Sequence, residues 1–248
     1  VRSPGEFEQA HIPNAFSLPL FNNEERAKVG TTYKQQSREA AIKIGLPLFG
    51  HKMLPMVEQV EQWVKHFENK NQNKPKLFVH CWRGGMRSAA VAWLLDLYGF
   101  SVYQIVGGYK SFRNFIIAQF EKPYSLRVLG GYTGSGKTEI LTHLQNVWNT
   151  DPHPSFAVID LEGLAHHKGS AFGHLGQEKQ PSQEMFENIV GLQLFKNAHK
   201  TILLEDESQR IGLVMLPSSF FQYLRKQDCY FIKIPFESRL EFIVKGYG

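Results

Sequence analysis

Residues 131–138, with the sequence GYTGSGKT, constrain this chain more than any other segment. They fit the pattern G-x-x-x-x-G-K-[ST] and stand between an apolar run at 126–129 and a helical pattern at 138–148, which is the context that this loop requires. Its glycines let backbone N–H groups turn inward around phosphate oxygens, and the helix N-terminus adds partial positive charge. The predicted phosphate-binding residues are Gly131, Gly134, Ser135, Gly136, Lys137 and Thr138.

Within this loop, Lys137 is placed to reach terminal phosphates and Thr138 to hold Mg²⁺. Carboxylates that end two later strands are further candidates for Mg²⁺ binding or acid–base chemistry. Asp160 follows the apolar run 156–159, and Glu205 and Asp206 end the run that begins at Thr201. The Glu205-Asp206 pair is more typical of a Walker B strand end, while a solvated strand end or a helix cap explains each carboxylate equally well.

A second loop carries a cysteine between an apolar strand at 77–80 and a helix at 89–98. Cys81 is followed by the C-x5-R-S spacing to Arg87 and Ser88. Backbone N–H groups, a helix N-terminus and the flanking Arg83 and Arg87 favour the thiolate. The predicted catalytic residues are therefore Cys81 as nucleophile, with Arg83 and Arg87 as thiol-activating and oxyanion-binding groups. The loop alone leaves open a phosphatase and a sulfur or selenium transferase.

The remaining pattern is an alternation of strands and helices typical of parallel α/β sheets. Further strands are expected at 102–106 and 230–234, and further helices at 53–67, 111–120 and 183–196. Residues 5–20 read as a loop punctuated by prolines, and 22–38 as a polar stretch. Pro123 marks a boundary, so the expected domains are residues 1–121 and 122–248.

Composition excludes several classes of protein. The chain has 248 residues, 42% of them hydrophobic and 21% charged, which excludes collagen-like, coiled-coil and wholly disordered chains. The longest uninterrupted apolar run, at 89–95, is far shorter than the roughly 20 residues that span a bilayer. Two distant cysteines make no disulfide framework, so a reduced cytoplasmic setting is expected, and Cys229 in an apolar strand is interpreted as structural. A net charge of +5 is compatible with a polyanionic partner.

The combination of the two loops resembles a known family. Residues 1–15 resemble the opening of a rhodanese domain, residues 80–88 its active-site loop and residues 106–110 its closing turn. The phosphate-binding loop follows, and then the segments 160–173 (DLEGLAHHKGSAFG) and 204–212 (LEDESQRIG). This order resembles the tRNA 2-selenouridine synthases, in which a rhodanese domain is fused to a P-loop domain. The implied fold is a rhodanese-like parallel-sheet domain followed by a P-loop NTPase-like parallel-sheet domain.

The resemblance implies an enzyme that converts the wobble 2-thiouridine of certain tRNAs to 2-selenouridine through an S-geranyl intermediate. Geranyl diphosphate and selenophosphate are the implied co-substrates, tRNA the implied partner, and an enzyme that supplies selenophosphate a further expected partner. Cys81 matches the family's catalytic cysteine. The family pattern also leads us to expect a strand before Val1 and a continuation after Gly248, so that both ends of the chain are truncated.

Other polar residues receive less specific roles. The candidate tRNA contacts are Lys110, Arg113, His166, His167, Lys168 and Arg210. No metal site is firmly predicted, because the histidine pair lacks further ligands at suitable spacing. Three rival functions stay open: a rhodanese-fold cysteine phosphatase or sulfurtransferase with a nucleotide-binding domain, a non-enzymatic tRNA- or nucleotide-binding module, and a kinase-like P-loop enzyme.

Overall fold

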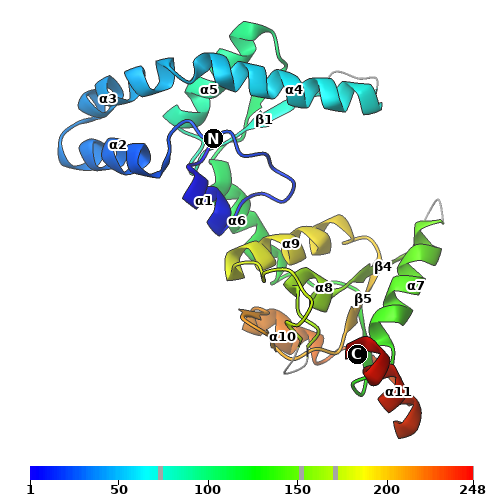
Figure 1. Cartoon of the computed structure of the whole chain (residues 1–248). Coiled ribbons are helices and arrows are strands. Elements are labelled where there is room, and N and C mark those ends of the chain that lie inside the picture. Colours follow the sequence, from blue (N-terminus) through cyan, green and yellow to red (C-terminus); the bar gives the residue numbers. More distant parts are fainter. Residues whose placement is uncertain (72–74, 151–153, 170–172, 248) are drawn as a thin grey trace. The chain divides into compact units, whose positions relative to one another are not determined.

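A computed structural model describes residues 1–71, 75–150, 154–169 and 173–247, and the chain divides into two compact units, Val1–Asn114 and Phe115–Gly248 (Figure 1). The first unit holds α1 (Pro4–Gln9), α2 (Asn23–Gln35), α3 (Arg38–Gly50), α4 (Met53–Asn71), β1 (Leu77–Val79), α5 (Met86–Tyr98) and β2 (Val102–Gln104). The division falls inside α6 (Gly108–Gln119).

The second unit carries the remaining elements in chain order. These are β3 (Leu126–Gly131), α7 (Lys137–Asn149), β4 (Phe156–Ile159), α8 (Leu161–Ala165), α9 (Gln183–Lys196), β5 (Thr201–Glu205), β6 (Arg210–Ile211), β7 (Val214–Met215), α10 (Ser218–Leu224), β8 (Cys229–Ile232) and α11 (Phe236–Tyr247). Strands β4, β5, β3 and β8 form one parallel sheet in that order. Helix α7 packs on β3, β4 and β5 around a core of Leu129, Leu141, Val158 and Leu203.

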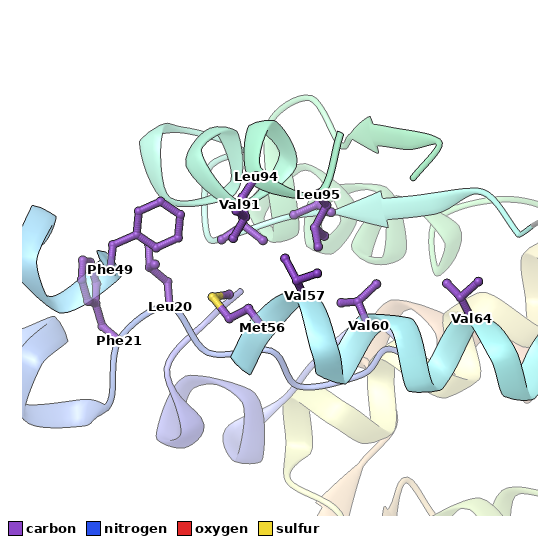
Figure 2. Close-up of a cluster of buried hydrophobic side chains, with 11 residues drawn as sticks. Leu20, Phe21, Phe49, Met56, Val57, Val60, Val64, Val91, Leu94 and Leu95 are labelled. Carbon is purple, nitrogen blue, oxygen red and sulfur yellow. The ribbon is translucent and has the colours of Figure 1, made fainter. Parts of the chain in front are cut away.

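The core of the first unit lies between α4, α5 and the parallel pair β1 and β2. Apolar residues recur along α4 at helical spacing, and this stripe is what buries the helix. Figure 2 shows the stripe of α4, with Met56 and Val57 opposite Val91, Leu94 and Leu95 of α5, and with Val60 and Val64 farther along α4 on the same side of the helix. Because β1 is anchored against this core, the residues that follow it are held at a fixed place.

The fold class predicted from the sequence is confirmed, since both sheets that carry the two loops are parallel and alternate with helices. The expectation of a loop over 5–20 is wrong at its start, where α1 forms. Pro4 occupies the first helical turn, and the Ser3 backbone N–H donates to Glu6 Oε2 at 2.9 Å in a capping box. A second capping box, between Asn22 and Glu25, begins α2 inside the expected polar stretch.

The expected domain boundary after residue 121 stays a prediction. The compact units of the structure divide after Asn114. Three residues of the family-like segment 160–173, numbers 170–172, lie outside the described residues. Within the described ranges, no helix combines the length and apolarity needed to cross a membrane.

Leu95→Ala should destabilise the first unit by about 2–4 kcal/mol, because Leu95 is 1% exposed and its truncation leaves a cavity between α4 and α5. Urea unfolding followed by tryptophan fluorescence measures this, in a chain with Trp148→Phe so that the remaining tryptophans all lie in the first unit. The matched control is Leu97→Ala on the same helix, where the leucine is 68% exposed. Equal effects of the two substitutions would contradict the packing described here.

Candidate functional site

Cys81 lies immediately beyond β1, in a loop that wraps its sulfur with hydrogen-bond donors. The residue is 4% exposed. Its Sγ accepts from the Gly85 backbone N–H at 3.3 Å and from the Ser88 hydroxyl at 3.4 Å. Helix α5 begins at Met86, so the sulfur faces the N-terminal end of that helix.

The loop keeps this shape because a glycine turn packs directly on it. Gly108 has φ +59°, and a Cβ there would lie 2.5 Å from the Cys81 carbonyl oxygen and would also clash with the Gly84 nitrogen. The backbone N–H groups of Tyr109 and Lys110 donate to the carbonyls of Cys81 and Trp82, each at 2.9 Å. Only a glycine lets the two backbones approach this closely.

The loop changes the acidity of the thiol in two opposing ways. Burial is the largest single influence and raises the pKa of the Cys81 thiol. Hydrogen bonds from the Ser88 hydroxyl and from the backbone N–H groups of Ser88, Gly85 and Arg83 act against it, and together they bring the pKa below its usual value. The neighbouring His80 has its pKa lowered to about 4, chiefly by burial, so its imidazole is neutral at physiological pH.

The two arginines of the loop have different surroundings. Arg83 is exposed, and its backbone N–H is the part that acts on the thiol. Arg87 is half-buried, and its Nη1 pairs with Glu6 Oε2 at 2.8 Å. Glu6 also pairs with Arg26 at 3.2 Å. The roles predicted for Arg83 and Arg87 therefore stay predictions, and no motif in the sequence indicates the partner Glu6.

The phosphate-binding loop occupies the expected position between β3 and α7. Lys137 Nζ donates to the Gly131 carbonyl at 3.1 Å, so the side chain folds back over the loop. Gly134 has φ +77°, and a Cβ there would lie 2.7 Å from the Arg239 carbonyl and 2.8 Å from Ile243 Cγ1 on α11. The contact with α11 thus requires glycine at this position of the loop.

Parallel pairing brings the predicted carboxylates Asp160 and Glu205 to one edge of the sheet, since Ile159 pairs with Leu204. Glu205 is fully buried, and Thr138 Oγ1 donates to its Oε1 at 3.0 Å. Burial, followed by the charge of Asp160, raises the pKa of Glu205 to about 7. Its Oε2 has no hydrogen-bond partner among the residues that the structure describes.

The predicted pair Glu205-Asp206 is divided between two surroundings, because Asp206 turns to an ion pair with Arg225. A carboxylate that the sequence analysis did not single out, Glu162, lies beside Glu205 instead. Burial and then the charge of Glu205 raise its pKa. Its position two residues after Asp160, in the first turn of α8, is the signal that could have identified it.

The phosphate-binding loop lines a cavity of about 620 Å³ in the second unit. Its walls include residues 133–138 of the loop, the carboxylates Asp160, Glu162 and Glu207, and the predicted contacts His167 and Lys168. Ser135 is 94% buried at the base of the loop, with 6% of its surface exposed. A cavity with backbone donors and a lysine on one wall and carboxylates on another suits a phosphorylated ligand together with a cation.

The other predicted tRNA contacts lie elsewhere. His166 ends α8, and its Nδ1 lies 3.0 Å from the Lys179 carbonyl. Arg210 is exposed and donates to the Gly212 carbonyl at 2.9 Å. In the first unit, Lys110 is exposed and Arg113 is half-buried, both on α6. Across the described part of the chain, no group of three or more His, Cys, Asp or Glu side chains is arranged to hold a metal ion.

Comparison with known proteins adds two family matches. Residues 124–248 match the family described as tRNA 2-selenouridine synthase AAA domain, and residues 1–115 match the rhodanese-like domain. Similar curated proteins are tRNA 2-selenouridine synthases from Nitrosomonas europaea, Nitrosomonas eutropha and Shewanella halifaxensis, which are 40%, 37% and 36% identical over the whole of this chain. The chain spans 62%, 62% and 64% of the lengths of these relatives.

The Glu6–Arg87 pair predicts an acid-sensitive first unit. Burial alone would raise the pKa of Glu6, but hydrogen bonds from Arg87 and Ser3 lower it from 4.5 to about 2. The stabilisation is therefore complete above pH 4.5 and is lost as pH falls from 4.5 to about 2. Glu6→Gln should cost about 2 kcal/mol at pH 7 and flatten this acid loss, as measured by urea unfolding at several pH values.

Glu8→Gln provides the control for this prediction, because Glu8 lies exposed on the same short helix. It should leave both the stability and its pH dependence unchanged. An acid loss of the same size in the Glu6→Gln chain would show that other groups control it.

Proposed function

This chain belongs to the tRNA 2-selenouridine synthase family, and from that membership we propose that it acts in the conversion of wobble 2-thiouridine in tRNA to 2-selenouridine. The observation that carries the proposal is the Cys81 sulfur, which lies at a helix N-terminus among two kinds of donor: backbone N–H groups and a serine hydroxyl. Such a sulfur is a nucleophile that holds an anionic group above it.

The proposed reaction has two steps. In the first, the thiouridine sulfur attacks the carbon that bears the diphosphate in geranyl diphosphate, and diphosphate leaves. In the second, selenium from selenophosphate attacks the base at the carbon that bears sulfur, and the S-geranyl group leaves as a thiolate. Cys81 serves the second step by attacking phosphorus, so that the phosphorus–selenium bond breaks and selenium departs with the bonding pair. The N–H groups of the loop then hold the phosphoryl group on the sulfur until water attacks phosphorus, which breaks the sulfur–phosphorus bond and releases inorganic phosphate and the Cys81 thiolate.

The cavity of the second unit suits a phosphorylated co-substrate. Lys137 and the N–H groups of residues 133–138 supply the positive side, and they suit the diphosphate of the geranyl donor or the phosphate of the selenium donor. Both alternatives use the same loop, so they are distinguished by assaying the two steps separately.

An Mg²⁺ ion would fit at the edge of this cavity. Thr138 Oγ1 and the buried, unpartnered Oε2 of Glu205 are hard oxygen donors, and Mg²⁺ commonly uses one or two such protein ligands together with substrate phosphates. When bound there, the ion would neutralise phosphate charge. Thr138 and Glu205 would position it, and the ion would favour the ionised form of Glu205, whose pKa is raised by burial and by the charge of Asp160.

The partner is proposed to be tRNA, with His167 and Lys168 at the cavity as its contacts in the second unit. A cysteine phosphatase is the second candidate, favoured by the C-x5-R-S spacing from Cys81 to Ser88. It requires hydrolysis of an aryl phosphate without tRNA, and this turnover must disappear in Cys81→Ser.

Cys81→Ala should lower the rate of selenium incorporation into tRNA at least about 100-fold, because the nucleophile acts only in the second step. Geranylation of thiolated tRNA should continue. Mass spectrometry of wobble nucleosides, after incubation of the protein with thiolated tRNA, geranyl diphosphate and selenophosphate, separates the two products. Cys229→Ala is the control and should keep both steps. Normal 2-selenouridine formation by Cys81→Ala would remove Cys81 from the reaction.

Lys137→Ala should slow whichever step uses the phosphorylated co-substrate of the cavity, by about 10- to 1,000-fold. One assay supplies geranyl diphosphate alone, and the other supplies selenophosphate with tRNA that already carries the S-geranyl group. Loss in only one assay identifies the ligand of the loop. The exposed Lys226, in the same unit, provides the control Lys226→Ala, and undiminished rates of Lys137→Ala in both assays would exclude the loop from substrate binding.

A further inference from the structure

Gln104, the last residue of β2, directs its side-chain amide at the Cys81 loop. Its Nε2 lies 2.5 Å from the Gly84 carbonyl oxygen, 2.9 Å from Ser88 Oγ and 3.4 Å from the Gly85 carbonyl oxygen. The amide therefore contacts the backbone of the loop and the hydroxyl that reaches the sulfur. None of the motifs in the sequence includes this residue.

The chemistry of the neighbours fixes which end of the amide faces the loop. Two of the three contacts, Gly84 O and Gly85 O, are carbonyl oxygens, which accept hydrogen bonds and cannot donate. The NH₂ end of Gln104 must therefore face them. Because that group only donates, Ser88 Oγ must accept from it at 2.9 Å.

This leaves the single proton of the Ser88 hydroxyl with two acceptors. One is the Cys81 sulfur at 3.4 Å, and the other is the Gly85 carbonyl at 3.0 Å. Gln104 also donates to the Gly85 carbonyl, so this carbonyl competes less strongly for the Ser88 proton. When the sulfur is ionised it is the stronger acceptor, since hydrogen bonds to an ionised group are the stronger ones.

We propose that Gln104 is a positioning residue for the Cys81 thiolate, acting through Ser88. Its amide occupies a lone pair of the hydroxyl and shares the competing carbonyl, and the hydroxyl proton is thereby turned toward the sulfur. The inference rests on the proposed function only for the premise that ionised Cys81 is the working form of the residue.

The position of Gln104 allows a clean test. The side chain is exposed overall, and the pairing of β2 with β1 uses backbone atoms, with the Ile105 N–H donating to the Val79 carbonyl at 3.0 Å. Gln104→Met keeps the length of the side chain and removes the donor. It should leave the strand pair in place, which far-ultraviolet circular dichroism checks.

The experiment titrates the thiol by its ultraviolet thiolate absorbance, as the difference between a Cys229→Ser chain and the same chain with Cys81→Ser. In the first background we compare Gln104→Met, Ser88→Ala, the two together, and the control Gln59→Met, which replaces an exposed glutamine on α4. Neither tRNA nor a selenium donor is present, so the titration is independent of whether the proposed reaction occurs.

Gln104→Met should lower the ratio of thiolate to thiol by about three- to tenfold at the pH where the parent chain is half ionised, which is the effect of losing one hydrogen bond. Ser88→Ala should lower it at least as much, and the double variant should match Ser88→Ala alone, because Gln104 acts through that hydroxyl. Gln59→Met should titrate like the parent. A parental titration of Gln104→Met overturns the proposal, and so does a double variant in which the two single effects add.

Discussion

The approach of the Gly108 backbone to the Cys81 loop is the constraint on which the first unit's chemistry depends. No side chain fits between these two backbones, and the carbonyl of Cys81 is tied to the Tyr109 N–H on the far side of the loop. With its carbonyls engaged there, the loop presents N–H groups to the sulfur. The acidity of the thiol is thus a consequence of hydrogen bonds from the Ser88 hydroxyl and from backbone N–H groups that this packing holds in place.

The second unit also holds its loop in place by a close backbone contact at a glycine, although its fold is different. Its loop also follows a parallel strand and precedes a helix. The lack of a side chain at Gly134 allows the backbone of α11 to approach, as the lack of one at Gly108 allows the Cys81 loop to approach. The parallel sheet adds a feature that the first loop lacks, because the ends of β4 and β5 bring Asp160 and Glu205 to the same edge. The first loop therefore surrounds its sulfur with hydrogen-bond donors alone, whereas the second loop stands beside carboxylates.

The sequence predicts those parts of the fold and of the two sites that depend on residues close together in the chain. Glycine spacing, apolar runs and the position of Cys81 predicted both loops, the parallel strands and the helices after them, since each signal lies within a few residues of the structure that it forms. Long-range partners had no such signal. Glu6 is separated from Arg87 by 81 positions, and Arg225 from Asp206 by 19, so a predicted arginine and a predicted carboxylate were found in ion pairs that no motif contains. Helix α1 forms where the proline pattern predicts a loop, because proline suits a first helical turn as well as a loop.

These partners change the electrostatic interpretation of the two sites. Glu6 offsets part of the charge of Arg87, so an anion above Cys81 is held chiefly by neutral dipoles that are already oriented. Oriented dipoles need no rearrangement when negative charge develops, which suits the role proposed for this loop, to stabilise both a thiolate and a transferred group. In the second unit negative groups predominate, since the half-buried Glu162 and the buried Glu205 lie near Lys137 and both have raised pKa values. In the proposed function, a phosphorylated ligand that brings its own cation would offset this negative charge, whereas the donors of the cysteine loop are already in place around the sulfur.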